Sequence, residues 1–240
     1  MEELSHAFFE EGSRVFTEIR GYDHMPPFLV TVVSSSDLWM FLSSLGPLTC
    51  GRRSPSGALF PYTTEDKIHD SVGRTGPWTC IAEGEALWSP FDPRGRERFR
   101  LERRFAMSTA HDVARFEEVN LDLGLTLRAS FEASERYGWV RSVELVNNRD
   151  EGRELKLVDG FVNLMPADAH PGLQNNSSVL VDAYRTAERV DELPLALVRL
   201  SSIPIDQPRP NESLRANVAS TLGLQGARIF MDERLSLIHI

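Results

Sequence analysis

Charged and aromatic residues gather between positions 52 and 70, and they could bind a polar ligand. The candidates are Arg52, Arg53, Tyr62, Asp66, Lys67 and Asp70. Arginine and carboxylate groups can each hold two hydroxyls, and an aromatic face packs against C–H groups, so this set suits a sugar. Tyr62 stands between Pro61 and two threonines, which makes it the ring we most expect to be exposed. The alternative is a structural loop in which these charges pair with one another.

Recognised catalytic and metal-binding motifs are missing from the sequence. It has no Gly-Lys-Ser/Thr phosphate loop, His-Glu-x-x-His, paired Cys-x-x-Cys or Gly-x-Ser-x-Gly. His69 and Asp70 are neighbours that could orient a base or bind a metal, although such a pair is more often a capped turn. Glu117 and Glu118 are adjacent, and on a strand they would point to opposite faces. We therefore assign no catalytic residue, no metal ligand and no cofactor.

Two apolar segments precede the 52–70 segment and would position it. Phe28 to Val33 and Leu38 to Ser43 are rich in branched and aromatic residues and are separated by a Ser-Ser-Ser-Asp turn. This pattern predicts a buried hairpin, which ends at Gly46-Pro47 before the polar segment begins. Residues 78–82 predict a further strand after that segment.

The middle of the chain has a strict two-residue period. Apolar residues occupy alternate positions at Leu121, Leu123, Leu125, Leu127, Ala129, Phe131 and Ala133. A helix would scatter these residues around its axis, so the period predicts one long strand. Trp139, Val143 and Leu145 predict a second strand, and residues 153–164 a third. Together they predict an antiparallel meander with one buried face, in an all-β fold built as a large two-sheet sandwich.

Other segments have weaker patterns. Leu4 and Phe8 are spaced for a short helix within residues 1–13, and residues 165–178 are predicted to be loop. Residues 179–190 fit either a helix or a strand. We favour a strand that pairs with residues 195–201.

Composition limits the class of partner. The chain has 240 residues and a net charge of -9, which disfavours nucleic acid and anionic membranes as partners. No apolar run approaches the roughly 20 residues needed to span a bilayer, and the acidic N-terminus has no secretory signal pattern, so we expect a cytoplasmic protein. Cys50 and Cys80 are too few for a disulfide framework and are expected to be buried thiols.

We interpret the last six residues, Leu235 to Ile240, as the translation of a sequencing adapter. They are an acceptable translation of CTG TCT CTT ATA CAC ATC, the transposase end sequence used to prepare sequencing libraries. We therefore assign residues 1–234 to one β-sandwich domain of a longer chain and residues 235–240 to a sequencing adapter. The alternative is a genuine apolar C-terminal strand.

The order of several short motifs resembles the N-terminal β-sandwich of the cellobiose and chitobiose phosphorylase family, which includes parts of the cyclic β-glucan synthases. The motifs are Ser44-Leu45-Gly46, the 52–70 segment, Trp88-Ser89-Pro90, Arg115-Phe116-Glu117 and the stretch from Arg141 to Asn148. The resemblance covers about residues 14–165. Residues 58–67 depart from the phosphorylase pattern, which leaves hydrolysis open beside phosphorolysis.

The resemblance implies a galactose-mutarotase-like supersandwich with minor helix, followed in the family by an (α/α)6 domain that carries the acid carboxylate and the phosphate site. We expect a domain of a glycoside phosphorylase or hydrolase that acts on β-linked oligosaccharides and is not catalytic alone. Inorganic phosphate would be a co-substrate of the full-length enzyme. The expected partners are an oligosaccharide, the (α/α)6 domain and, if the protein is a homodimer, a second copy of the chain. The alternative is a non-catalytic carbohydrate-binding module or a structural domain.

Overall fold

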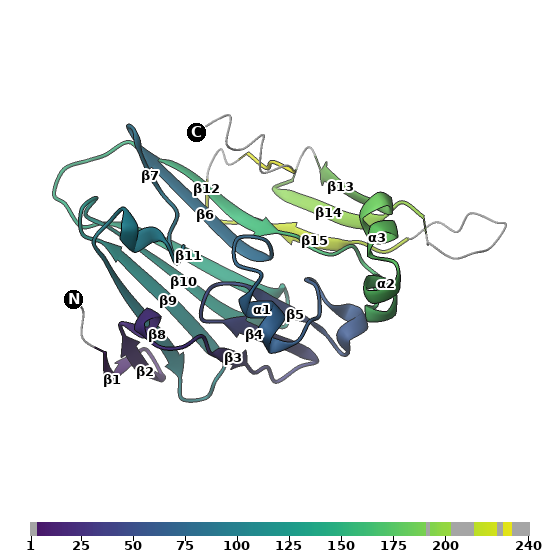
Figure 1. Cartoon of the computed structure of the whole chain (residues 1–240), viewed down its shortest axis with the longest axis horizontal. Helices are drawn as coiled ribbons and strands as arrows, with labels where there is room; N and C mark the ends of the chain where they lie inside the picture. The colour runs from purple at the N-terminus through teal and green to yellow at the C-terminus, as the bar shows by residue number, and fades with distance from the viewer. Residues whose placement is uncertain (1–3, 191–192, 203–213, 225–227, 232–240) are drawn as a thin grey trace.

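Antiparallel strands are the predominant secondary structure and helices are few and short, which confirms the all-β prediction (Figure 1). The computed structural model describes residues 4–190, 193–202, 214–224 and 228–231. Within these residues the strands form one six-stranded sheet and three sheets of three strands each. No helix in this part of the chain is long and apolar enough to cross a membrane.

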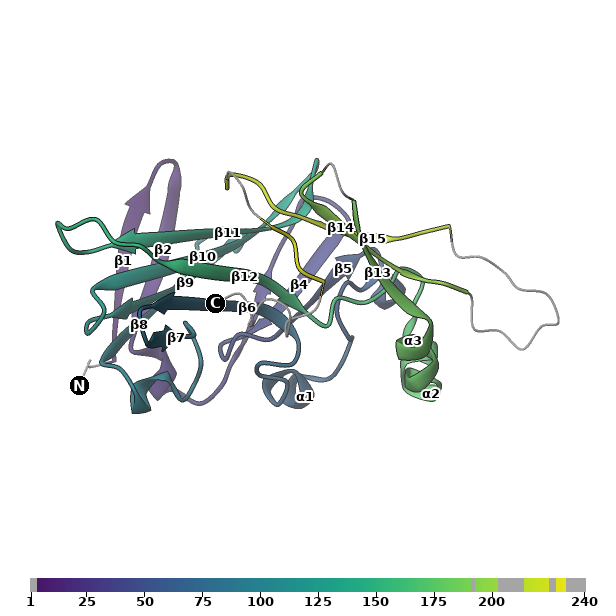
Figure 2. The ribbon, with the colours of Figure 1, turned by 90° about the horizontal axis from the view of Figure 1, so that it is seen from above.

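The six-stranded sheet has the order β1-β2-β8-β9-β10-β11. Its strands are β1 (Ser5–Glu11), β2 (Arg14–Arg20), β8 (Leu101–Ser108), β9 (Val113–Asn120), β10 (Leu125–Ser134) and β11 (Gly138–Asn147). Strands β8 to β11 follow one another as an antiparallel meander, and the β1–β2 hairpin joins it through β8. In Figure 2 this hairpin stands upright at one end of the sheet.

Side chains alternate between the two faces of this sheet. Phe105, Phe116 and Phe131 are buried on the inner face. Arg104, Glu117 and Arg128 occupy the alternate positions of the same three strands, so they lie on the outer face. One face is therefore apolar and packed, while the other carries charges, as the period of two predicts.

Two smaller sheets cover the inner face and complete a sandwich. They comprise β3 (Leu29–Val32), β4 (Leu38–Ser43) and β5 (Leu48–Arg52), and β6 (Gly76–Glu83), β7 (Ala86–Trp88) and β12 (Lys156–Val162). Met40 and Leu42 pack with the phenylalanines of the large sheet, and Ile81 packs with Leu125 and Leu127. Both cysteines are buried and free, as predicted.

A buried ion pair lies within this sandwich. Arg103 on β8 and Glu118 on β9 are 2.6 Å apart, and their side chains are 4% and 0% exposed. Glu118 also accepts hydrogen bonds from Trp88 Nε1 and from the backbone N–H of Phe91. These bonds connect the large sheet to β7 and the loop that follows it.

Short helices and a third small sheet complete the chain. The helical elements are η1 (Tyr22–His24), η2 (Pro55–Gly57), α1 (Glu65–His69), η3 (Gly95–Glu97), α2 (Pro171–Asn176) and α3 (Ser178–Tyr184). The sheet has the order β13 (Arg185–Val190), β14 (Leu195–Leu200), β15 (Asn217–Ser220). Met165, Ala169, Val181 and Leu200 form a separate small core in this part of the chain.

The predicted N-terminal helix is wrong. Residues 5–11 form strand β1, because they find a partner in β2 and Phe9 stacks on Phe16 with ring centroids 5.2 Å apart. Gly12, with a φ of 61°, closes the turn between the two strands. Pairing with a neighbouring strand outweighs the i, i+4 spacing of Leu4 and Phe8.

Three other predicted boundaries also need correction. Leu121 and Leu123 lie in the turn before β10, which begins at Leu125 because Gly124 has a φ of 64° there. The strand predicted within 153–164 exists, but it pairs with β6 and does not extend the meander. The apolar pairing also extends past the predicted end of the hairpin at Gly46-Pro47, because residues 48–52 form β5 and pair with β4.

The C-terminal third combines correct and incorrect predictions. The 165–178 segment contains helix α2, whose first turn is capped when the backbone N–H of Leu173 donates to His170 Nδ1. Residues 179–184 belong to α3 and residues 185–190 form strand β13, so the favoured strand prediction is wrong for the first half and correct for the second. The predicted pairing with residues 195–201 is confirmed for β13 and β14. Residues 235–240 lie outside the described part of the chain.

Candidate functional site

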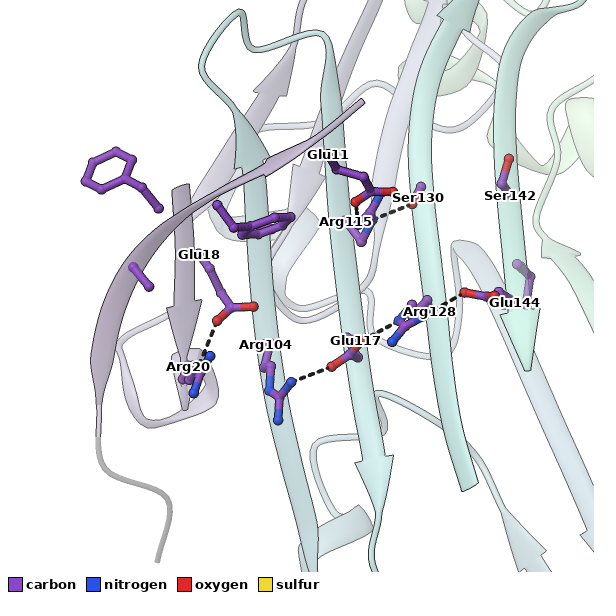
Figure 3. Close-up of a pocket in the computed structure, with 15 residues that line it drawn as sticks. Glu11, Glu18, Arg20, Arg104, Arg115, Glu117, Arg128, Ser130, Ser142 and Glu144 are labelled. Carbon is purple, nitrogen blue, oxygen red and sulfur yellow. Dashed lines mark hydrogen bonds and ion pairs between the residues drawn. The ribbon is translucent and has the colours of Figure 1, made fainter. Parts of the chain in front are cut away.

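The outer face of the six-stranded sheet contains an open hollow of about 600 Å³ (Figure 3). Its lining comes from β1, β2, β8, β9, β10 and β11, so every strand of the sheet contributes. This volume falls within the range of roughly 300–1,000 Å³ typical of small-molecule sites. We refer to this feature as the hollow.

Small residues form its floor. Ala106, Ser130 and Ser142 lie on β8, β10 and β11, and Ser130 and Ser142 face each other across the strand pair. Because neighbouring outward positions carry long arginine and glutamate side chains, these short ones leave space between them. The depth of the hollow thus follows from where small residues fall on the outward face.

The β1–β2 hairpin forms one wall. Glu11 on β1 reaches across two intervening strands to Arg115 on β9, with Nη1 and Oε2 2.5 Å apart. Arg115 Nε also donates to Ser130 Oγ on the floor, at 3.2 Å. The hairpin is therefore bent over the face of the sheet and held there by an ion pair (Figure 3).

A chain of ion pairs crosses the opposite side of the hollow. Arg104 Nη1 lies 3.1 Å from Glu117 Oε1, and Arg128 Nε donates to Glu117 Oε2 at 2.5 Å. Arg128 Nη1 then donates to Glu144 Oε2 at 2.9 Å. Each of the four adjacent strands β8, β9, β10 and β11 supplies one member of this chain of ion pairs.

An apolar surface adjoins the polar one. The rings of Phe9 and Phe16 are stacked at an interplanar angle of 9°, and the Arg115 guanidinium lies 5.1 Å from the Phe16 centroid on its ring face. Phe16 is 2% exposed, whereas Phe9 is partly exposed and lines the hollow. The hollow thus combines an aromatic ring with planar hydrogen-bonding groups.

Opposite charges balance in the lining. It contains four arginines and four glutamates, namely Arg20, Arg104, Arg115, Arg128, Glu11, Glu18, Glu117 and Glu144. The hydrogen bond that Arg115 donates to Glu11 lowers the pKa of Glu11, and the hydrogen bond that Arg128 donates to Glu117 raises the pKa of Arg128. Both groups are therefore charged at neutral pH.

All four carboxylates of the lining contact a guanidinium. Glu18 pairs with Arg20 at 2.6 Å, and the other three belong to the contacts described above. A carboxylate that already accepts a hydrogen bond from an arginine is poorly placed to protonate a leaving group. The arrangement is consequently suited to holding a polar ligand and poorly suited to general acid catalysis.

The six residues singled out by the sequence lie elsewhere. Arg52 and Arg53 both reach Asp37, at 3.4 and 3.2 Å, so the pairing expected of a structural loop occurs here. Tyr62 is 40% exposed, as expected, and its ring meets that of Trp39 edge-on at 5.5 Å. None of the six lines the hollow.

Helix α1 and its C-cap carry the remaining three residues. Asp66, Lys67 and Asp70 are exposed, and the contact with Thr64 lowers the pKa of Asp66. His69 is turned inward, where its Nδ1 lies 2.7 Å from the buried Ser43 Oγ. The structure thus divides the six residues between the end of β5 and the α1 region, and their role in binding stays a prediction.

Sequence reasoning missed the hollow, although part of its signal was present. Arg128 and Ser130 alternate with the apolar residues of β10, and Arg115 alternates with Phe116 on β9. Such residues ordinarily form a solvated face. The bend of β1 over β9, which encloses them, joins residues 104 positions apart and has no local signature.

The described residues contain no group of three or more His, Cys, Asp or Glu side chains placed to hold a metal ion.

The fold and site together define an antiparallel β-sandwich with a charge-balanced hollow on its larger sheet. No protein-family model matches this chain, and no curated protein is similar to it in sequence.

Proposed function

We propose that this domain binds an oligosaccharide in the hollow and belongs to a carbohydrate-active enzyme that acts on β-linked oligosaccharides. The observation that carries the proposal is the composition of the hollow: the partly exposed ring of Phe9 lies beside guanidinium and carboxylate groups already fixed by ion pairs. Sugars require both an apolar surface for C–H groups and planar polar groups for hydroxyls.

Preorganisation also supports binding. Arg128 is held at two nitrogens by Glu117 and Glu144, and Arg115 is held by Glu11 and Ser130. Side chains that are fixed before the ligand arrives lose less conformational entropy on binding. A carboxylate bound to arginine keeps further lone pairs free, which can accept hydrogen bonds from sugar hydroxyls.

In this proposal the bond-breaking chemistry belongs to another part of the enzyme. Displacement at the anomeric carbon, by phosphate or by water, needs a carboxylic acid to protonate the leaving oxygen. The glutamates of the hollow all contact arginine and do not fit that role. The same observation favours our second candidate, a carbohydrate-binding module with no catalytic activity.

A single substitution on the floor tests the location. Ser142 is exposed at the base of the hollow, so Ser142→Trp would fill the space without disturbing the core. We expect calorimetric titration with cellotetraose to give measurable heat for the unsubstituted chain and at least a tenfold loss of affinity for Ser142→Trp, equivalent to about 1.4 kcal/mol.

The matched control is Ser220→Trp. Ser220 is also an exposed strand serine, but it lies on β15 in a different sheet and does not line the hollow. Binding should survive this change. No heat with the unsubstituted chain at millimolar cellotetraose would refute the proposal, and equal affinities for the two tryptophan variants would refute the assignment to the hollow.

A further inference from the structure

The lining of the hollow carries as many glutamates as arginines, and this balance has a consequence for ligand choice. Arginines alone would attract an anion. Here, however, Arg115 is paired with Glu11, and Arg128 is paired with Glu117 and Glu144. An anionic ligand would have to approach these carboxylates as closely as the arginines.

We infer that Glu11 and Glu144 restrict the hollow to uncharged saccharides by neutralising the arginines that would otherwise hold an anion. This inference rests on the proposed function and adds the residues that set its specificity. Both carboxylates are accessible to a ligand, since their side chains are 54% and 62% exposed. Glu117, at 12% exposed, lies between two arginines and mainly holds them in place.

The position of these two residues supports the assignment. Glu11 is on the β1 wall and reaches Arg115 on β9, whereas Glu144 is on β11, two residues from the floor serine Ser142 (Figure 3). Each contacts an arginine of the lining, Glu11 contacting Arg115 and Glu144 contacting Arg128. A carboxylate on the ligand would therefore meet a like charge beside each of these two arginines.

The test removes both charges while keeping the shape of the side chains. Glu11→Gln/Glu144→Gln changes the net charge of the lining from zero to +2 if the other charges are unchanged. The ligands are cellotetraose and a cellouronate tetramer, which has the same linkage but a carboxylate at each C6. Calorimetry at low salt is appropriate because salt screens exposed charges.

For the unsubstituted chain we expect the cellouronate to bind at least tenfold more weakly than cellotetraose. For the double variant we expect the ratio of cellouronate affinity to cellotetraose affinity to rise about tenfold, because two like charges that face the ligand's carboxylates have been removed. The ratio is the readout because Glu11 and Glu144 also hold Arg115 and Arg128 in place, so the substitutions should weaken cellotetraose binding as well.

A matched control has the same net change in charge outside the hollow. The control variant is Glu10→Gln/Glu188→Gln. Glu10 matches Glu11, because it is its neighbour on β1. Glu188 on β13 matches Glu144, because it pairs with Arg199 on the adjacent strand β14 as Glu144 pairs with Arg128 on β10. This variant should keep the preference of the unsubstituted chain for cellotetraose over cellouronate.

If the ratio of cellouronate affinity to cellotetraose affinity is the same in both double variants, the inference is overturned. The proposed function then still stands, provided that the unsubstituted chain binds cellotetraose. If neither tetramer binds the unsubstituted chain, both proposals are refuted.

Discussion

Glu117 and Glu118 are adjacent in the sequence and have opposite surroundings. Glu117 faces the hollow, while Glu118 is fully buried between Arg103, Trp88 and the backbone of Phe91. Burial raises the pKa of Glu118, whereas Arg103 and the Trp88 N–H oppose that rise. The period of two in a strand is enough to place one of two adjacent carboxylates in the hollow and the other in the interior.

Removing one partner of the buried pair should be strongly destabilising. Arg103→Met would leave the Glu118 charge without its 2.6 Å partner and remove the bond from Arg103 Nη2 to the Asp92 carbonyl oxygen. We expect urea denaturation to show a loss of about 3–5 kcal/mol in the free energy of unfolding. Arg103→Met/Glu118→Gln should recover part of this loss, because no unpaired charge remains buried.

The control for this prediction is an exposed pair of the same type. Arg199 and Glu188 are 2.7 Å apart, with side chains 37% and 48% exposed. Arg199→Met should therefore cost no more than about 1 kcal/mol. Equal losses for the two arginine substitutions would contradict the assignment of Arg103 to a buried network.

At the scale of elements, β5 depends on one glycine. A Cβ at Gly51 would lie 2.5 Å from the Gly57 carbonyl oxygen and 2.8 Å from Ala58 Cα, both of which are backbone atoms. We expect Gly51→Ala to lower the free energy of unfolding by at least about 2 kcal/mol, since the backbone after β5 must move.

Gly160 is the matched position for this experiment. It lies within strand β12, and a Cβ there would meet nothing within 4 Å. Gly160→Ala should be neutral or stabilising by up to about 1 kcal/mol, because alanine reduces the entropy of the unfolded chain. The β5 prediction fails if thermal melts give the two variants the same shift.

Local patterns predicted the elements whose pairing partners are close in sequence. The hairpin of β3 and β4 and the pair of β10 and β11 are joined by short turns, so alternation alone located them. Strand β1 was missed because its spacing also fits a helix, and only pairing with β2 and packing of Phe9 on Phe16 decide the matter.

The candidate site was harder to predict than the strands. The sequence directed attention to Arg52 and Arg53, which lie side by side along the chain and meet Asp37. The hollow brings Glu11 together with Arg115, a contact that depends on the bend of a hairpin over a distant strand. A pattern of charges along one strand indicates which face is wet, but not whether another strand will enclose it.

At the scale of the whole molecule, the chain has cores of unequal size. The main cluster joins both layers of the sandwich, from Tyr22 to Phe131, whereas Val181 and Leu200 belong to a separate cluster of four buried residues near the C-terminal sheet. Apolar residues close to that smaller cluster remain exposed, including Val179 at 77% and Val218 at 58%. Less buried apolar surface means less free energy opposing local opening.

We therefore expect the C-terminal sheet to open before the sandwich does. Val181→Ala, at a residue 2% exposed, should speed amide hydrogen exchange in β13, β14 and β15 and leave β8, β9 and β10 unchanged. Leu127→Ala, at a residue fully buried in the sandwich, should instead lower global stability by about 2–5 kcal/mol and speed exchange in both regions. If Val181→Ala speeds exchange equally in all six strands, the chain unfolds as one cooperative unit. The hollow would then lose its structure together with the C-terminal sheet, whereas independent opening would preserve it.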